Sequence, residues 1–153
     1  MTELSIRQAG EEDLATIIGF FAADELGGHG DTSDPQAFPE YLAAFRRIAT
    51  SDSQTLYVAE RDGEVVGTFQ TMITTTLSGR GSSSMIVEAV QTRPDCRGQG
   101  IGAAMIRFCL EQARERGLAQ VQLTSNAARL DAHRFYERLG FKKSHFGFKF
   151  KLK

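Results

Sequence analysis

The sequence predicts one mixed α/β domain that spans residues 1–153. Three observations predict this class: strand-like and helix-like apolar patterns alternate, an Asp62-Gly63 pair joins two β-rich runs, and no Pro/Gly/Ser-rich linker interrupts the chain. Hydrophobic residues make up 41% of the chain and charged residues 24%, as in an ordinary globular protein. The predicted order is β-α-α-β-β-β-α-β-α-β-β, with about seven strands and four helices.

The first third of the chain is predicted to hold one strand and two helices. Alternating polarity over residues 4–8 favours a short strand. Residues 9–25 begin with acidic residues and continue with apolar residues at helical spacing, and residues 36–50 show the same apolar periodicity. Residues 26–35 are dense in Gly, Asp and Ser, which predicts a loop between the helices.

The middle of the chain is predicted to be a hairpin followed by a strand. Residues 55–74 contain two β-rich runs around Asp62-Gly63, a pair that favours tight hairpin turns. Residues 75–84 are rich in Gly and Ser and predict a flexible connection. The apolar run over residues 85–92 then predicts a buried strand.

The last part of the chain is predicted to alternate helices and strands. A helix starts at Ile101, carries one apolar stripe and ends at Gly117. A strand over residues 119–125 and a helix over residues 128–140 follow. The segment 141–152 is predicted to form strands with one buried face, because it alternates Phe146, Phe148 and Phe150 with other residues.

The charge of the chain is divided along its length. The net charge of −1 combines five Arg and 14 acidic residues in residues 1–92 with 13 basic and five acidic residues in residues 93–153. Eight acidic residues and no Lys or Arg lie from Glu11 to Tyr41. Solvated surface explains any single charge, but the division favours an anion bound by the second half and a cation bound by the first. A pI near 6.3 without a basic stripe disfavours nucleic acid as a partner.

The sequence also predicts a cytoplasmic protein without a metal or membrane partner. The N-terminal residues lack a signal-peptide pattern, and no apolar run approaches the roughly 20 residues that span a bilayer. The spacing of Cys96 and Cys109 matches no metal-binding or redox motif, so we expect reduced thiols and no metal ligands.

Residues 93–106, RPDCRGQGIGAAMI, place glycines where the predicted strand turns into the predicted helix. Glycines allow backbone N–H groups to approach a ligand, and the helix N-terminus and Arg97 favour an anion, most naturally a pyrophosphate. No lysine follows the glycines, which excludes a P-loop. A dinucleotide fold is disfavoured because the glycines do not directly follow the strand and no acidic residue lies about 20 positions on. A tight turn without a ligand is the alternative.

Two motifs together give the sequence its resemblance to a known family. Arg97-Gly98-Gln99-Gly100-Ile101-Gly102 resembles the Q/R-x-x-G-x-G/A pattern of the GNAT superfamily of acyl-CoA N-acyltransferases. The segment 124–143 resembles the family pattern N-x-x-A-x-x-F/Y-Y-x-x-x-G-F, through Asn126, Ala132, Phe135, Tyr136, Gly140 and Phe141. The resemblance covers residues 85–145 and implies the GNAT fold with a mostly antiparallel central sheet. It also implies acetyl-CoA as acyl donor and direct attack by the acceptor amine, without a covalent enzyme intermediate.

The resemblance further implies residues for the coenzyme. Val90 and Thr92 would bond the pantetheine, and a main-chain N–H near Val90 would hold the oxyanion. The remaining residues expected at the coenzyme are Arg97, Gly98, Gln99, Gly100, Ile101, Gly102, Ala103, Asn126, Arg129, Ala132 and His133. For Asn126, an ordinary helix-capping role is the alternative.

Two residues are candidates for catalysis. Tyr136 matches the family tyrosine near the sulfur, where a phenol could protonate the departing thiolate. Its alternative role is packing, with the hydroxyl bonded to the backbone. Glu88 lies among apolar residues of the strand 85–92, where burial would raise its pKa toward that of a useful base. An equal alternative is that Glu88 lies on a solvent-exposed face of the strand and forms a structural contact.

We therefore expect an N-acetyltransferase that acts on the primary amine of a small cationic metabolite. Acetylation of a protein N-terminus or lysine, and a non-catalytic CoA-binding regulatory module, are the alternatives. Relatives often dimerise through C-terminal strands, and the Phe-rich end of this chain permits a homodimer.

Overall fold

The computed structural model describes residues 3–24 and 29–153. It contains two compact units, the first ending at Gln122 and the second covering Leu123–Lys153, and each is described by itself. Part of the loop predicted over residues 26–35 lies outside the described residues. The single domain expected over residues 1–153 remains a prediction.

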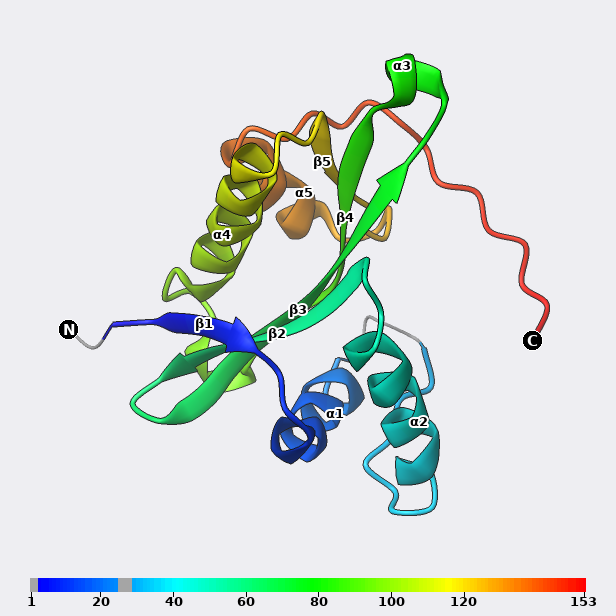
Figure 1. Cartoon of the computed structure of the whole chain (residues 1–153). Coiled ribbons are helices and arrows are strands. Elements are labelled where there is room, and N and C mark those ends of the chain that lie inside the picture. Colours follow the sequence, from blue (N-terminus) through cyan, green and yellow to red (C-terminus); the bar gives the residue numbers. More distant parts are fainter. Residues whose placement is uncertain (1–2, 25–28) are drawn as a thin grey trace. The chain divides into compact units, whose positions relative to one another are not determined.

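A five-stranded sheet with the order β1-β2-β3-β4-β5 forms the centre of the fold (Figure 1). β1, β2, β3 and β4 pair antiparallel in sequence order. β5 begins beside the start of β4, where the Ala119 N–H donates to the Ser83 carbonyl at 2.8 Å, as expected for a parallel pair joined by a helix. The strands are β1 Ser5–Gln8, β2 Gln54–Arg61, β3 Glu64–Thr75, β4 Ser83–Thr92 and β5 Gln120–Leu123.

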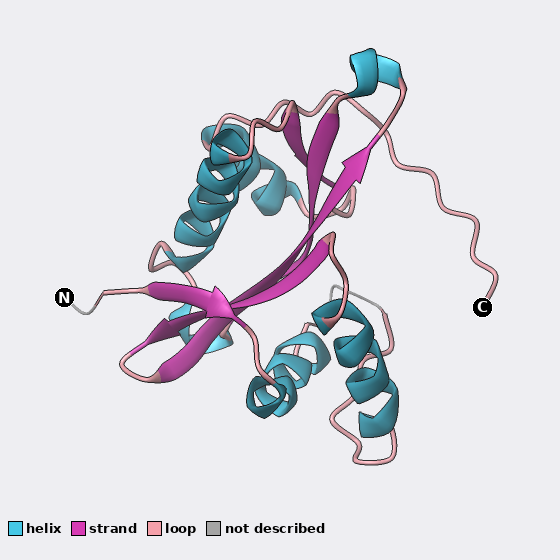
Figure 2. Ribbon diagram, in the orientation of Figure 1, coloured by secondary structure: helices cyan, strands magenta, loops and turns pink. Residues whose placement is uncertain are grey.

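In the first unit, helices cover both faces of the sheet (Figures 1 and 2). α1 (Leu14–Ala22) and α2 (Phe38–Ala49) lie on one face, and α4 (Ile101–Glu115) packs against β3 and β4 on the other. The 3-10 turn η1 (Glu11–Asp13) precedes α1, and the 3-10 turn η2 (Pro94–Cys96) precedes residues 97–100, which we call the glycine loop. The second unit contains α5 (Leu130–Arg138).

Alternation along the strands divides the core between the two faces. Leu56 and Val58 of β2 join the apolar side of α1 and Phe45 of α2 in one buried cluster. On the other face, the Tyr57 ring stacks on Phe69 with centroids 4.9 Å apart, and Phe108 of α4 meets the Tyr57 ring edge-on at 5.2 Å. Two buried layers thus hold the sheet between its helices.

The predicted count of seven strands and four helices is not matched. Residues 141–153 form no strand, and the side chains of Phe146, Phe148, Phe150 and Leu152 are 89–95% exposed, so the expected buried face is absent. Alternation favours an extended chain, but a strand also needs partners for its backbone groups and a cover for its apolar side. In the connection 75–84, α3 (Ser78–Gly81) adds a fifth helix, one short turn that includes non-helical Gly79 and Arg80.

One acidic residue of the charge-rich first third is buried. Asp13 is 5% exposed and accepts hydrogen bonds from Arg7 at 2.7 and 2.9 Å and from the Gly10 N–H at 2.8 Å. Arg7 also donates to Glu60 of β2 at 2.6 Å. The hydrogen bond from Arg7, followed by that from Gly10, holds the pKa of Asp13 below its usual value against the opposing effect of burial. This network ties β1 to η1 and β2.

Candidate active site

The glycine loop connects β4 to α4 through two residues in the left-handed region. Gly98 has φ 78° and Gly100 has φ 84°, and Gly100 is the N-cap of α4. A side chain would be strained at either position, although a Cβ would meet no atom within 4 Å. The loop conformation therefore depends on glycine because of backbone geometry rather than crowding.

The start of α4 presents unused backbone donors. Across residues 3–24 and 29–153, no hydrogen-bond acceptor is found for the N–H groups of Gly100, Ile101, Gly102 and Ala103, whereas the Ala104 N–H donates to the Gly100 carbonyl at 3.0 Å. Four such donors at a helix N-terminus attract an anion. Arg97 is exposed one residue before the first left-handed glycine and adds positive charge. This geometry suits the pyrophosphate expected from the sequence.

Side chains of the β2–β3 hairpin contact the segment that leads into the loop. Arg93 donates to Asp95 at 2.7 Å and to Glu64 at 3.0 Å, and its N–H donates to the Val66 carbonyl at 2.8 Å. The hydrogen bond from Arg93 lowers the pKa of Asp95. The loop is therefore anchored to the sheet on its N-terminal side.

A β-bulge interrupts β4 at Ala89 and Val90. Gln70 pairs with Glu88 and Thr68 with Gln91, so two residues of β4 lie opposite Phe69 alone. Ala89 has φ 53°, a left-handed conformation that is strained for a residue with a Cβ. The irregularity lies at the position where the resemblance places the oxyanion donor.

β5 accompanies only part of β4. Both strands start side by side, but β5 has four residues and β4 has ten. Within the first unit, the later part of β4, including Val90 and Thr92, therefore extends past the end of β5. Unpaired backbone groups on a strand edge can bind an extended ligand as an added strand, as the pantetheine arm requires.

Glu88 is exposed, so the expected burial is wrong, and its position matches the solvent-exposed face of the alternative. Its neighbours Met85 and Val87 are buried, as the apolar run indicated, but alternation directs Glu88 to the opposite face of β4. An exposed carboxylate keeps its hydration and can still attract an ammonium group. Burial in the strand therefore gives no support to a role for Glu88 as a base.

The second unit holds the other expected residues on α5 and the turn before it. Asn126 caps this turn: its Oδ1 accepts the Ala128 N–H at 2.9 Å, and its carbonyl accepts the Arg129 N–H at 3.0 Å. The Asn126 carbonyl also lies 2.9 Å from His133 Nε2, which must carry the proton. In the part of the chain that the structure describes, His133 Nδ1 is buried without a hydrogen-bond partner. Asn126 therefore stabilises the turn before α5, but the helix-capping alternative is not matched, because the N-cap of α5 is Arg129 and no side chain caps it.

Tyr136 lies on α5, and its ring contacts Phe135 and Phe141 edge-on at 5.1 and 5.8 Å. These rings fix the direction of the phenol within the second unit. Ala132 lies one turn earlier on the same helix and is half-buried. The loop, the bulge and Glu88 belong to the first unit, whereas Asn126, Arg129, Ala132, His133 and Tyr136 belong to the second.

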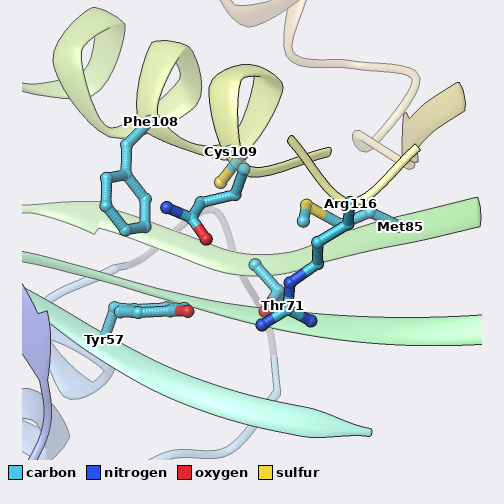
Figure 3. Close-up of a pocket in the computed structure, with 7 residues that line it drawn as sticks. Tyr57, Thr71, Met85, Phe108, Cys109 and Arg116 are labelled. Carbon is cyan, nitrogen blue, oxygen red and sulfur yellow. The ribbon is translucent and has the colours of Figure 1, made fainter. Parts of the chain in front are cut away.

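The described residues of the first unit line at least two hollows. The first, between α4 and the sheet, is lined by Tyr57, Thr71, Met85, Phe108, Cys109, Gln112 and Arg116, and it admits no water-sized molecule (Figure 3). It is a packing crevice, and burial there raises the pKa of Cys109 to about 12. The second, of about 360 Å³, lies between α1, α2 and residues 32–35.

The second hollow combines an apolar floor with a polar edge. Ala15 and Ile18 of α1 and Phe38 and Tyr41 of α2 line it together with residues 32–35. The Tyr41 hydroxyl donates to Asp31 at 2.7 Å, and burial followed by this hydrogen bond raises the pKa of Tyr41. Among the described residues, no group of three or more His, Cys, Asp and Glu is placed to hold a metal ion, and no helix is long and apolar enough to cross a membrane.

Sequence reasoning missed two polar contacts near the site. Gln91, which follows the bulge, donates to Asp24 at 2.7 Å, and Arg61 donates to Gln99 of the glycine loop at 2.7 Å. These pairs are 67 and 38 residues apart in the chain, and no local pattern links such distant positions. For the contact between Arg61 and Gln99, the sequence contains one signal: the Asp62-Gly63 turn predicts that β2 ends at Arg61.

Comparison with known proteins gives one family. The model of the Acetyltransferase (GNAT) family matches residues 11–141, a range that runs across both units. The aminoalkylphosphonate N-acetyltransferase of Salmonella typhimurium is 41% identical over 116 residues, which cover 75% of this chain and 72% of that protein. The glucosamine 6-phosphate N-acetyltransferase of Trypanosoma brucei brucei is 30% identical over 144 residues, 93% of this chain and 91% of that protein.

A solved structure shares the architecture of the chain. The crystal structure of a protein named as a transcriptional regulator from Bacillus halodurans C-125 matches with a TM-score of 0.93 and 38% identity. The match covers 98% of this chain and 100% of that one. The mixed α/β fold is therefore that of the matched family.

Proposed function

Because the chain belongs to the GNAT acetyltransferase family, and is thereby an acetyl-CoA-dependent N-acetyltransferase, we propose that it acetylates the primary amine of a small metabolite. The observation that carries the proposal is the set of N–H groups from Gly100 to Ala103 without a hydrogen-bond acceptor among the described residues. These donors lie at the start of α4, where Gly98 and Gly100 adopt left-handed conformations. The family match across both units supports a single functional domain over residues 1–153.

The donor side of the reaction draws on backbone groups. Arg97 and the N–H groups of residues 98–103 bind the diphosphate of CoA. The pantetheine arm pairs with the open edge of β4 at Val90 and Thr92. The bulge turns a main-chain N–H near Val90 out of the ladder, and this donor stabilises the oxyanion that forms on the thioester carbonyl.

The remaining steps form the amide bond, break the thioester bond and transfer two protons. The neutral amine attacks the thioester carbon, the C–N bond forms, and collapse of the intermediate breaks the C–S bond. Glu88, through a water molecule, accepts the proton that the amine loses, and Tyr136 protonates the departing thiolate. The resemblance also assigns Asn126, Arg129, Ala132 and His133 to the coenzyme, and we keep this assignment as part of the proposal.

The acceptor is a small amine whose ammonium group is drawn to the acidic first third of the chain. The 360 Å³ hollow beside α1 and α2, with Asp34 on its edge, has the size and polarity for such a molecule. The names of the two relatives described above refer to amines that carry a phosphonate or phosphate group. Aminoalkylphosphonates and phosphorylated amino sugars are therefore the first acceptors to test.

The experiment combines CoA binding with an acceptor screen. Calorimetry should detect CoA uptake, and release of free CoA from acetyl-CoA should occur with one class among amino acids, polyamines, aminoglycosides, aminoalkylphosphonates and amino sugar phosphates. Turnover only with peptides would favour the protein-acetylating alternative. CoA binding without turnover on any class would favour the regulatory module.

We also propose a second copy of the chain as a partner. Phe146, Phe148 and Phe150 are about nine-tenths exposed at two-residue spacing, so an extended tail would present one apolar face to a partner strand. Light scattering should show a dimer that Phe148→Ser converts to a monomer.

Both cysteines are buried free thiols, which supports the reducing cytoplasm as the compartment.

A further inference from the structure

Arg61 reaches the glycine loop from a distant part of the chain. It is the last residue of β2, directly before the turn formed by Asp62 and Gly63. Its Nη1 donates to Gln99 Oε1 at 2.7 Å, and its Nη2 donates to Cys96 Sγ at 3.4 Å. One guanidinium therefore contacts both η2 and the loop that follows it.

Gln99 occupies the most demanding part of this loop. It lies between Gly98 and Gly100, the two glycines with positive φ, and its side chain is exposed. Without a restraint, the backbone here can adopt many conformations, because glycine has no side chain to limit its dihedral angles. A charge-assisted hydrogen bond of 2.7 Å on the residue between the glycines supplies that restraint.

The hairpin thus holds the segment 93–99 at both ends. Arg93 bonds Glu64 and the Val66 carbonyl of β3 before the loop, and Arg61 of β2 bonds Gln99 within it. The N–H donors of α4 begin immediately after the second contact. A sheet strand is more rigid than a loop, so these contacts transmit the rigidity of the hairpin to the anion site.

We propose that Arg61 is a positioning residue for coenzyme binding: by holding Gln99, it pre-organises the loop that receives the diphosphate of CoA. This inference rests on the proposed function, because it assigns the loop to CoA. Pre-organisation lowers the entropy lost on binding, so it affects affinity for CoA and leaves the acyl transfer step unchanged. Gln99 occupies a variable position of the Q/R-x-x-G-x-G/A pattern, so the motif alone does not indicate this role.

The test is a double-mutant cycle on CoA affinity, measured by calorimetry with Arg61→Met, Gln99→Leu and the combined variant. Each single substitution should weaken CoA binding about tenfold, the effect expected from loss of one charge-assisted hydrogen bond. The combined variant should bind no more weakly than the weaker single variant, since both remove the same contact. Arg61→Lys should recover part of the affinity, because the ammonium can also donate to Gln99.

The controls separate positioning from charge and from folding. Arg46→Met removes an equal charge from α2, where Arg46 bonds Glu11 at 3.1 Å, and should leave CoA affinity unchanged. At saturating acetyl-CoA, kcat and the KM for the acceptor should match the parent enzyme in Arg61→Met, because Arg61 acts only through the position of the loop. Gln99 is exposed, so its variant keeps the test valid if Arg61→Met folds poorly.

Two results would overturn the inference. Equal CoA affinity of parent and both single variants would show that the contact does not position the loop. Additive losses in the combined variant would show that Arg61 acts on the diphosphate by charge, independently of Gln99. If the parent protein itself binds no CoA, the proposed function fails instead, and this outcome is distinct from the other two.

Discussion

Replacement of Asp13 by Asn should destabilise the first unit through loss of one buried charge. Asp13 is 5% exposed and accepts three hydrogen bonds, two of them from Arg7. Asn keeps one acceptor oxygen but carries no charge, so the Arg7 contacts weaken while the Gly10 contact can persist. Hydrogen bonds to charged groups contribute roughly 1.5–3 kcal/mol each, and Arg7 is 40% exposed and keeps Glu60, so we expect a loss of about 2 kcal/mol.

The effect should depend on pH with a defined sign. Because Arg7 lowers the pKa of Asp13 in the folded protein, its ionisation stabilises the fold above the unfolded pKa of about 3.9. This contribution is lost as the pH falls through the lower folded pKa. The difference in unfolding free energy between the parent and Asp13→Asn should therefore be full at pH 7 and shrink below about pH 4.

Urea denaturation followed by circular dichroism at several pH values measures the loss of unfolding free energy and its pH dependence. At pH 7 the urea concentration at the midpoint should fall. In a thermal melt, Tm should decrease by about 4–8 °C for a chain of this size. Glu12→Gln removes an exposed carboxylate next to Asp13 and should change stability by less than about 0.5 kcal/mol. Equal effects of the two substitutions, or a constant Asp13 effect down to pH 3, would refute the assigned network.

Three further predictions concern the site and its support. Gly100→Ala places a Cβ at φ 84° and should lower stability by about 1 kcal/mol and weaken CoA binding, whereas Gly117→Ala, at φ 68°, should lower stability alone; calorimetry and thermal melts distinguish them. Gly67→Val should cost about 1–3 kcal/mol in urea unfolding, because a Cβ there would lie 2.8 Å from Met105 Sδ under α4. Tyr136→Phe should lower kcat about 100-fold without changing CoA affinity, and an unchanged kcat would exclude Tyr136 as the acid.

The conformation of the glycine loop could be predicted from local sequence. Glycines at 98 and 100 before an amphipathic run predict a strand-to-helix turn with free N–H groups, and the structure has left-handed glycines and open donors at that place. Such features depend on neighbours in the chain, because backbone conformation and helix termini are local properties. The hairpin turn at Asp62-Gly63 and the start of α4 at Ile101 could be predicted for the same reason.

Pairing across the chain could not be predicted in this way. The bulge at Ala89, the exposure of Glu88 and the absence of strands after Phe141 depend on which backbone or surface lies opposite each residue. The Asp13 carboxylate shows the same limit: eight acidic residues from Glu11 to Tyr41 look alike in sequence, yet Asp13 is buried. Arg7, which precedes that acidic stretch, compensates its charge, and Glu60 completes the network from β2.

The sequence by itself determined the left-handed turn at the glycines, the order of most elements and the family to which they belong. Tertiary structure alone decided that Arg61 contacts Gln99, that β5 is shorter than β4, and that Glu88 is exposed to solvent. The physical reason is that local patterns set backbone conformation and polarity, whereas burial and long-range hydrogen bonds exist only after distant segments pack together.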